Sequence, residues 1–254
     1  MDQPQIKKIM KTSNKLTIAA ILLILVSLIY YDLMLKVSYQ GGTYKDQFKD
    51  FVTLNFKDFK SIDLGSSTAS NIIVKQGPFS VRIEPAATQF VKVSQRDQTL
   101  HIETAFPGNY QNSRGDYVLV ISCPNLVRFD ADARYMAGDR QIIDTLASED
   151  FKWRPTIISG FTLDSLSITE KHASSIILIR NKIKVIHAVI GLSDGSRSNM
   201  IIQKDNQFSN ANLNILNKSQ LQLHEAIIPN LKYQIADSAK LIITGALKNQ
   251  IIKK

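Results

Sequence analysis

The residues best suited to metal binding are few and lie far apart in the chain. Its four histidines are His101, His172, His187 and His224. They form neither an HxxxH nor an HExxH arrangement, in which the spacing brings two imidazoles to one zinc ion. No cysteine or carboxylate cluster accompanies them. We therefore expect each histidine to lie on the surface of a strand, and we expect no zinc site.

One acidic run is reminiscent of a calcium-binding loop. Asp130, Asp132 and Asp139 lie close together, and Gly138 stands among them. An EF-hand loop needs ligands at fixed alternate positions and a closing glutamate, because calcium takes six to eight oxygen ligands. The run lacks both that spacing and that glutamate, so it does not predict a calcium site.

The sequence also lacks motifs for nucleophilic catalysis and for phosphate binding. The segment GSRSN, which starts at Gly195, lacks the final glycine of a nucleophile elbow. Cys123 is the only cysteine, which excludes an intrachain disulfide. It stands in an apolar run before Pro124, as a buried cysteine would. We predict no catalytic, cofactor-binding or metal-binding residue, and no cofactor.

The charge balance is mildly basic. The chain has 31 Lys and Arg against 22 Asp and Glu, with 44% hydrophobic and 21% charged residues. These fractions are normal for a globular protein and argue against disorder. The basic residues are scattered, and no aromatic side chains are interleaved with them as in a nucleic-acid surface. We therefore expect no nucleic-acid partner.

The element most clearly written in the sequence is an apolar helix near the N-terminus. Residues 16–35 read LTIAAILLILVSLIYYDLML, from Leu16 to Leu35, and Asp32 is their single charge. Twenty helical residues rise about 30 Å, which matches the hydrocarbon core of a bilayer. The segment predicts one transmembrane helix in contact with lipid. A cleaved signal peptide is the alternative, but it needs a shorter apolar core and small residues at the cleavage site.

The flanks of this helix predict its orientation. Residues 1–15 form a basic tail with four lysines, which are Lys7, Lys8, Lys11 and Lys15. Only Lys36 follows the helix closely, and the positive-inside rule therefore places the N-terminus in the cytoplasm. Residues 36–50 read as a polar linker, and residues 51–254 then form a domain outside the cytoplasm.

The distal domain reads as all-β. Val81 and Ile83, like Leu100 and Ile102, show the alternation of half-buried strands. Short polar turn segments separate such runs at fairly regular intervals. Residues 133–160 break this pattern, since they contain Trp153, a proline and glycines, and they predict an insertion or a long loop.

A strand–turn–strand repeat fills the second half of the domain. Four runs carry it, and their aligned turn serines are Ser174, Ser196, Ser219 and Ser238. These serines lie 22, 23 and 19 residues apart, near the short end of the periods that solenoid repeats show. The spacing favours a parallel β-helix, in which each coil buries its inward side chains against the next. An antiparallel sandwich with coincidental spacing is the alternative.

These strands resemble the GIN domains of auto-transporter adhesin heads, a family found on the envelope of Bacteroidetes-type Gram-negative bacteria. The likeness runs through FKDFKSIDL at residues 56–64, IIVKQG at 72–77, TLHI at 99–102 and YVLVISCPNL at 117–126. It covers about 200 residues, and the downstream Ser and Asn turns complete it. The resemblance implies a right-handed β-helix-like fold and an envelope location. Together with the predicted helix and its orientation, it leads us to expect an anchor in the inner membrane and a domain in the periplasm.

Three functions remain open on these grounds. The leading one is a non-enzymatic envelope protein that binds another protein or a glycan through a face of stacked strands. A polysaccharide-acting β-helix enzyme is the second, although the acidic residues do not recur at equivalent repeat positions. The third is a structural module that associates with itself as a homo-oligomer, because the last strands have no obvious polar cap.

Overall fold

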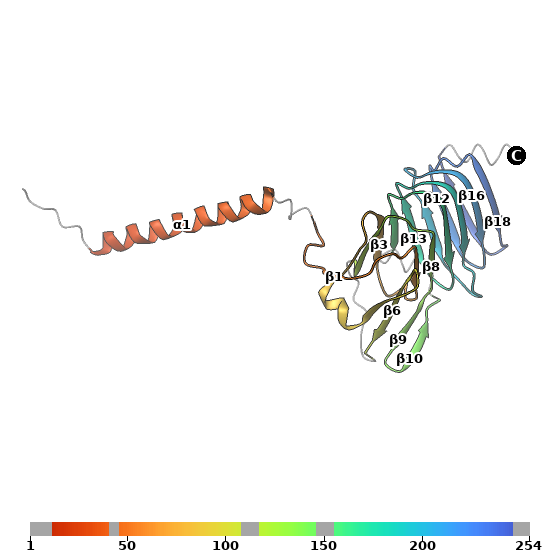
Figure 1. Cartoon of the computed structure of the whole chain (residues 1–254), viewed down its shortest axis with the longest axis horizontal. Coiled ribbons are helices and arrows are strands. Elements are labelled where there is room, and N and C mark those ends of the chain that lie inside the picture. The colour runs from red at the N-terminus through yellow and green to blue at the C-terminus, as the bar shows by residue number, and fades with distance from the viewer. Residues whose placement is uncertain (1–11, 41–45, 108–116, 146–154, 246–254) are drawn as a thin grey trace, which may run out of the picture. The chain divides into compact units, whose positions relative to one another are not determined.

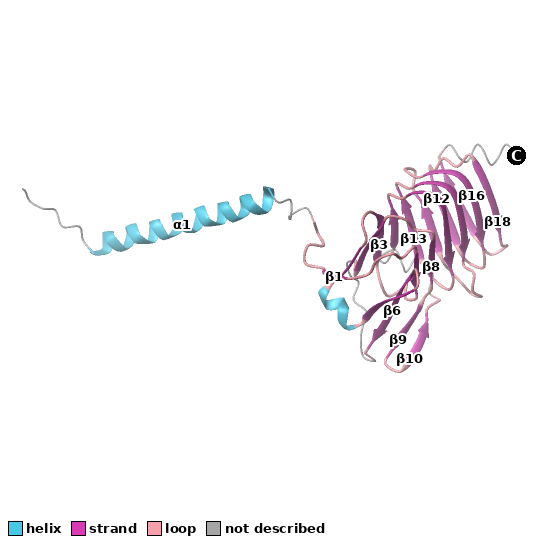
Figure 2. Cartoon of the chain, in the orientation of Figure 1, coloured by secondary structure: helices cyan, strands magenta, loops and turns pink. Residues whose placement is uncertain are grey.

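A computed structural model of the chain describes residues 12–40, 46–107, 117–145 and 155–245. The chain divides into two compact units, Met1–Lys49 and Asp50–Lys254. Among the described residues, the first unit contains one long helix and the second contains nineteen strands and a short 3-10 helix, η2 (Pro85–Gln89). Figures 1 and 2 show these elements, coloured along the chain and by type.

Helix α1 spans Thr12–Gln40 and is therefore longer than the predicted helix at both ends. Its flanks hold no proline or glycine before Gly41, so nothing in residues 12–15 or 36–40 stops the helix. None of its residues is buried. The helix is long and apolar enough to span a membrane or to act as a signal anchor.

The strands form two open sheets. The nine-stranded sheet has the order β1 (Val52–Leu54), β4 (Ser80–Ile83), β7 (Leu119–Cys123), β3 (Ile72–Gln76), β11 (Thr156–Ser159), β13 (Ser175–Ile179), β15 (Asn199–Ile202), β17 (Gln220–His224) and β19 (Lys240–Thr244). The ten-stranded sheet has the order β10 (Arg140–Ile143), β9 (Arg134–Ala137), β6 (Thr99–Phe106), β2 (Ser61–Leu64), β8 (Arg128–Ala131), β12 (Thr162–Glu170), β14 (Lys182–Ile190), β16 (Gln207–Ile215) and β18 (Asn230–Ile235). A further strand, β5 (Val91–Arg96), pairs with β6.

Both sheets are mixed. Antiparallel pairs occur near the N-terminal end of each, where β1 pairs with β4, β4 with β7, β5 with β6 and β9 with β10. From β11 onward every pairing is parallel, and consecutive strands alternate between the two sheets. The molecule is therefore mostly β, with one apolar N-terminal helix, and its sheets do not close on themselves.

The parallel strands stack in register. In the nine-stranded sheet, the paired positions Ile157, Ile177, Ile201, Gln222 and Ile242 lie 20, 24, 21 and 20 residues apart. Each predicted strand–turn–strand run corresponds to the end of a strand in one sheet, a turn, and a strand in the other. The predicted serine alignment is wrong at two of its four positions. The register aligns Ser174, Ser198, Ser219 and Ala239. The turn before β15 is four residues longer than its neighbours, which accounts for Ser198 in place of Ser196 but not for Ala239 in place of Ser238.

The core runs along the stack between the two sheets. Ile158, Leu178, Ile202 and Leu223 occupy the same register position on successive strands, and all four are fully buried. On the opposite sheet, Ile168, Ala188 and Leu213 form a similar column, also buried. Burying one such Ile or Leu side chain contributes roughly 1.5–3 kcal/mol relative to exposure. The stacked aliphatic columns are therefore what fixes the register.

Two asparagines connect the short turns on one side of the stack. Asn181 is fully buried, and its Nδ2 donates to the Ile158 carbonyl at 2.9 Å and to Asn206 Oδ1 at 3.0 Å. Its Oδ1 accepts the Phe161 N–H at 3.0 Å. Phe161 precedes β12, and Asn206 precedes β16. The Asn181 side chain thus satisfies two backbone groups of the β11–β12 pair and also bonds the Asn206 side chain, which precedes β16.

Residues 133–160, expected as an insertion or long loop, contain three strands in their described part, which are β9, β10 and β11. β9 and β10 form an antiparallel hairpin that turns at Gly138, whose φ is +58°. β11 then pairs in parallel with both β3 and β13. Because β11 links the N-terminal and C-terminal strands of the nine-stranded sheet, part of this segment belongs to the core architecture. Residues 146–154 lie outside the described part.

Candidate functional site

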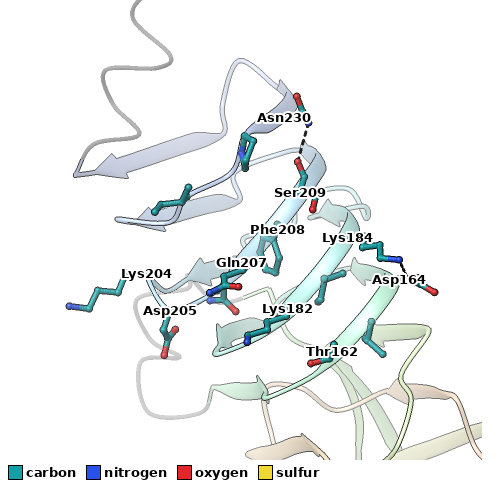
Figure 3. A pocket seen from close by; sticks show the side chains of 15 residues that line it. Thr162, Asp164, Lys182, Lys184, Lys204, Asp205, Gln207, Phe208, Ser209 and Asn230 are labelled. Carbon is teal, nitrogen blue, oxygen red and sulfur yellow. Dashed lines mark hydrogen bonds and ion pairs between the residues drawn. The ribbon is translucent and has the colours of Figure 1, made fainter.

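A groove lies where β12, β14 and β16 begin (Figure 3). It measures about 780 Å³ and also takes in the segment between β17 and β18. Its polar lining residues include Asp164, Lys182, Lys184, Lys204, Asp205, Gln207 and Asn230. Four successive strands or turns therefore contribute side chains to one surface.

A repeated irregularity builds this groove. In β12, Asp164 and Ser165 are both exposed between the buried residues Leu163 and Leu166. The same step, with two consecutive residues outside the core, recurs in β14 at 184–185 and in β16 at 209–210. At Asp164, Lys184 and Ser209 the regular residue-to-residue pairing between β12, β14 and β16 is interrupted. Such an interruption of the alternation bends a strand as a bulge does. Because the step stacks in register, the three strands change direction together.

The groove carries an excess of positive charge. Lys184 Nζ lies 2.7 Å from Asp164 Oδ1, and this hydrogen bond and charge lower the pKa of Asp164 below its usual value. Asp205 Oδ1 accepts the backbone N–H of Arg180 at 3.1 Å. Lys182 and Lys204 have no ion-pair partner within the described ranges. They lie on the side of the groove that Asp205 occupies in Figure 3.

Apolar and amide groups complete the surface. The Ile227 side chain is 68% exposed and stands beside Pro229. Asn230 Nδ2 donates to the Ser209 carbonyl at 3.3 Å, which fixes one amide at the rim. Phe208 lies below this surface and is buried, so no exposed aromatic ring lines the groove. The arrangement suits an extended anionic ligand, whose charges would meet the lysine ammonium groups and whose polar and apolar groups would meet the amides and the exposed aliphatic side chains.

A second, smaller pocket of about 410 Å³ adjoins β2, β6 and β9. Asp63 Oδ2 lies 3.1 Å from His101 Nδ1, and Asp132 Oδ2 accepts a hydrogen bond from Arg134 Nε at 2.6 Å. Each of these carboxylates is thus already paired with a basic side chain. Lys92, Glu103 and Lys171 also line this pocket and have no ion-pair partner among the described residues, so the pocket differs from the groove mainly in its smaller volume.

Asp132 and His172 form a pair that resembles part of a nucleophile triad. His172 Nδ1 lies 2.6 Å from Asp132 Oδ1. Burial raises the pKa of Asp132, but hydrogen bonds from His172, the Ala133 N–H and Arg134 outweigh it and hold the pKa below its ordinary value. The nearby Ser196 hydroxyl donates to the His172 carbonyl at 2.5 Å, not to its ring. The pair holds two turns together, and no described hydroxyl or thiol completes a triad.

The most perturbed carboxyl group lies inside the core. Glu170 is fully buried, in register with Ala131, Ile190 and Ile215. Desolvation raises its pKa to about 8, although a hydrogen bond from the Ser174 hydroxyl works against the rise. Glu170 Oε1 has no hydrogen-bond partner among the described atoms. A substrate outside the sheets cannot reach this group.

Buried serines extend from Glu170 along the turns. Ser174 Oγ lies 3.3 Å from Ser198 Oγ, and Ser196 Oγ lies 3.2 Å from both Ser198 Oγ and Ser219 Oγ. All four serines are at most 1% exposed. These hydroxyls satisfy one another and the backbone, so their role is structural.

The structure separates the residues that the sequence analysis considered for metal binding. Asp130 pairs with Arg128 at 2.7 Å, Asp132 pairs with Arg134 and His172, and Asp139 is exposed in the β9–β10 turn. His187 and His224 face Asn212 and Gln222. His172 lies in a turn and not on a strand. Across residues 12–40, 46–107, 117–145 and 155–245, no group of three or more His, Cys, Asp or Glu could hold a metal ion.

Reasoning from the sequence missed the groove. Its members come from positions 162 to 230 and meet only through the parallel register. A signal was present, because an apolar residue, two outward residues and another apolar residue recur at 163–166, 183–186 and 208–211. For the Asp132–His172 pair, the sequence carries no comparable pattern.

Comparison with known proteins gives only remote likenesses. No family model matches the chain, and no curated protein matches it. A "putative adhesin" from Bacteroides fragilis has a similar solved structure, with 13% identity, a TM-score of 0.35, and coverage of 76% of this chain and 97% of that one. A "putative adhesin" from Parabacteroides merdae has 10% identity and a TM-score of 0.34, and the match covers 77% of this chain and 95% of that one. A "putative lipid binding protein" from Parabacteroides distasonis has 11% identity and a TM-score of 0.27, and the match covers 77% of this chain and 94% of that one. Likeness at these scores carries no inference about binding or activity.

Proposed function

We propose that this protein is a non-enzymatic envelope protein that is anchored by α1 and binds another macromolecule through its strand domain. In this proposal α1 crosses the inner membrane once, with the N-terminus in the cytoplasm and the strand domain in the periplasm. The apolar, unburied α1 supports the anchor. The four lysines before it, against the single Lys36 closely after it, support the orientation.

We infer further that the domain is of the GIN type and that β11 to β19 form a right-handed parallel β-helix-like stack. The in-register parallel pairings and the alternation of strands between the two sheets support this reading. Parallel crossovers of this kind are right-handed in nearly all proteins. A stack of this kind gives a rigid surface on which side chains repeat at the strand spacing of about 4.8 Å.

The observation that carries the binding proposal is the groove with its two lysines, Lys182 and Lys204, that lack ion-pair partners in the described structure. A protein or a glycan could enter it. The exposed Ile227 and the cationic rim favour an acidic polypeptide segment over a sugar chain, because no exposed aromatic ring is present to pack against a sugar face. Charge complementarity of this kind gives both steering and specificity.

The carboxylates argue against catalysis in the groove. A glycosidase needs one carboxyl group with a raised pKa that reaches the scissile bond and a second carboxylate across from it. Asp164 has a lowered pKa because of Lys184, and Asp205 accepts a backbone hydrogen bond. Glu170 has a raised pKa but is sealed in the core.

A binding titration tests this function on the full chain in detergent. The probes are poly-L-glutamate, as an acidic polypeptide, and polygalacturonate, as an acidic glycan. We expect the wild-type chain to bind poly-L-glutamate, and the double variant Lys182→Glu, Lys204→Glu to bind it at least about tenfold more weakly, since two attractive contacts become repulsive. The double variant Lys218→Glu, Lys232→Glu is the matched control, because it makes the same change in net charge and both lysines are exposed and do not line the groove.

Three results would contradict the proposal. Equal weakening by the control variant Lys218→Glu, Lys232→Glu would mean that the overall charge attracts the probe. Tighter binding of polygalacturonate would assign the groove to a glycan. Release of shortened oligosaccharides from polygalacturonate would make the protein an enzyme.

A further inference from the structure

The two ends of the strand stack are finished differently. At the N-terminal end, antiparallel strands and η2 cover the core, so that Ala87 is fully buried and Phe106 is 5% exposed. At the C-terminal end, β18 pairs only with β16 and β19 only with β17 within the described residues. The outer edges of both strands therefore present backbone donors and acceptors without a described partner.

The core columns lose their cover at the same end. Ile215 is fully buried, whereas Ile235, its register partner on β18, is 43% exposed. Leu213 is 3% exposed and its partner Tyr233 is 39% exposed. Leu241 and Ile243, which face inward on β19, are likewise only partly buried. The interior of the stack is thus open where the strands end.

Features that normally protect an edge strand are sparse here. Proteins block edges with proline, bulges or several charges. β19 reads KLIIT and β18 reads NLKYQI, with one lysine each and no proline within either strand. Both strands are long enough to pair along five or six residues. The end is therefore suited to accept further strands.

We propose that a second copy of this chain docks on this end, with β19 pairing antiparallel to β19 of the other copy around Ile242. A partner that covers both columns must offer two apolar columns with the same separation as the two sheets. The open end of a second copy meets this requirement because it is built from the same two sheets. Two-fold pairing of this kind is self-complementary. Leu241 then lies opposite Ile243 of the other copy, and the core continues across the junction.

The charges agree with this register. Antiparallel pairing around Ile242 places Lys240 opposite Thr244 of the other copy. The two Lys240 side chains then lie four residues apart along the strands, about 14 Å, which exceeds the screening length of roughly 8 Å at physiological salt. A register that brought the lysines opposite each other would be repulsive.

Disulfide crosslinking of the full chain in native membranes tests the proposal. Paired residues on antiparallel strands have Cβ atoms about 4.5–5.5 Å apart, within reach of a disulfide after modest adjustment. On mild oxidation with copper phenanthroline, Ile242→Cys should give a covalent dimer as the main product. Lys240→Cys alone should give little dimer, and the double variant Lys240→Cys, Thr244→Cys should restore it. The wild-type chain is the background control, since Cys123 is buried.

A truncation separates this proposal from its nearest rival. Residues 246–254 follow β19 directly and could instead cover the open end. If a second copy docks there, ending the chain after Gly245 leaves the Ile242→Cys crosslink unchanged or strengthens it. A crosslink that forms only after truncation would overturn the proposal in favour of the tail. The proposal also fails if none of residues 240–244 crosslinks, or if the yield is greatest at a position other than 242.

Discussion

At the scale of single residues, Glu170 is the side chain whose position most needs a physical account. It occupies a register position that Ile190 and Ile215 fill with aliphatic groups, and one of its oxygens has no described partner. A buried ionised carboxylate is very costly, so the group is protonated at neutral pH. In the protonated state it can share a hydrogen bond with Ser174, where the serine chain along the turns begins.

This burial predicts a pH dependence of stability. The pKa of Glu170 is about 8 in the folded chain and near 4.5 when unfolded, so the folded state binds more protons between these values. Its contribution to stability is therefore complete below about pH 4.5 and is lost as the pH rises to about 8. Glu170→Gln keeps the shape without the ionisation.

Thermal unfolding of the full chain in detergent, measured from pH 4 to 9, checks this dependence. Between pH 4.5 and 8 the melting temperature of the wild type should fall relative to that of Glu170→Gln. The corresponding loss in the free energy of unfolding is on the order of a few kcal/mol. Glu103→Gln, at an exposed position on β6, should follow the wild-type curve. Parallel curves for wild type and Glu170→Gln would show that the carboxyl does not titrate in this window.

At the scale of elements, the longer turn before β15 decides how the repeat is aligned. It spans residues 191–198, whereas the turns before β13, β17 and β19 are four residues long. Gly191 and Gly195 both lie in it with positive φ, +82° and +73°. A Cβ on Gly191 would lie 2.0 Å from Ser219 Oγ and 2.8 Å from the Leu216 carbonyl oxygen, whereas a Cβ on Gly195 would meet nothing within 4 Å.

These two glycines form a matched pair for a test. Gly195→Ala should lower the free energy of unfolding by about 1 kcal/mol, the strain of a left-handed backbone alone. Gly191→Ala carries the same strain and a clash with the next turn, and should lower it by roughly 2–4 kcal/mol. Urea denaturation of the two variants measures the difference. Equal losses would mean that the Ser219 turn yields without cost.

The same turn shows what the sequence can and cannot predict. Alternation located the strands around Ile72, Val81 and Leu100, because half-buried strands must alternate. The repeat was also visible, but its register depended on the length of one turn, so Ser196 was chosen where Ser198 aligns. The groove depended on that register in turn. A one-residue error moves every side chain to the other face, so surfaces built across strands are the last features to become predictable.

At the scale of the whole molecule, α1 and the strand domain belong to separate compact units with very different surfaces. The helix has no buried residue, and apolar side chains such as Leu25, at 49% exposure, lie on its surface. In water this much exposed apolar surface is unfavourable, so a membrane is its natural surrounding. The predicted helix was nevertheless too short, because hydropathy defines the lipid-facing stretch and not the ends of the hydrogen-bonded helix.

Charge placed in the helix should release the protein from the membrane. Arginine at the middle of a membrane helix costs about 3 kcal/mol, so the double variant Leu22→Arg, Leu25→Arg should lose most of its membrane integration. Alkaline carbonate extraction measures the retained fraction. Leu192→Arg, an exposed leucine in the strand domain, makes the same chemical change and should stay in the membrane pellet. Full retention of the double variant would mean that α1 is not what holds the chain in the membrane.

The in-register stacking of strand pairs also bears on how this domain can change over evolutionary time. Each pair contacts only its neighbours, so duplicating about 20 residues adds one layer without disturbing the layers already present. Every duplication lengthens the column by about 4.8 Å and carries the lysines, amides and aliphatic groups of its parent layer with it. The length of the strand stack can thus change in fixed increments, while the surface chemistry of each increment diverges independently.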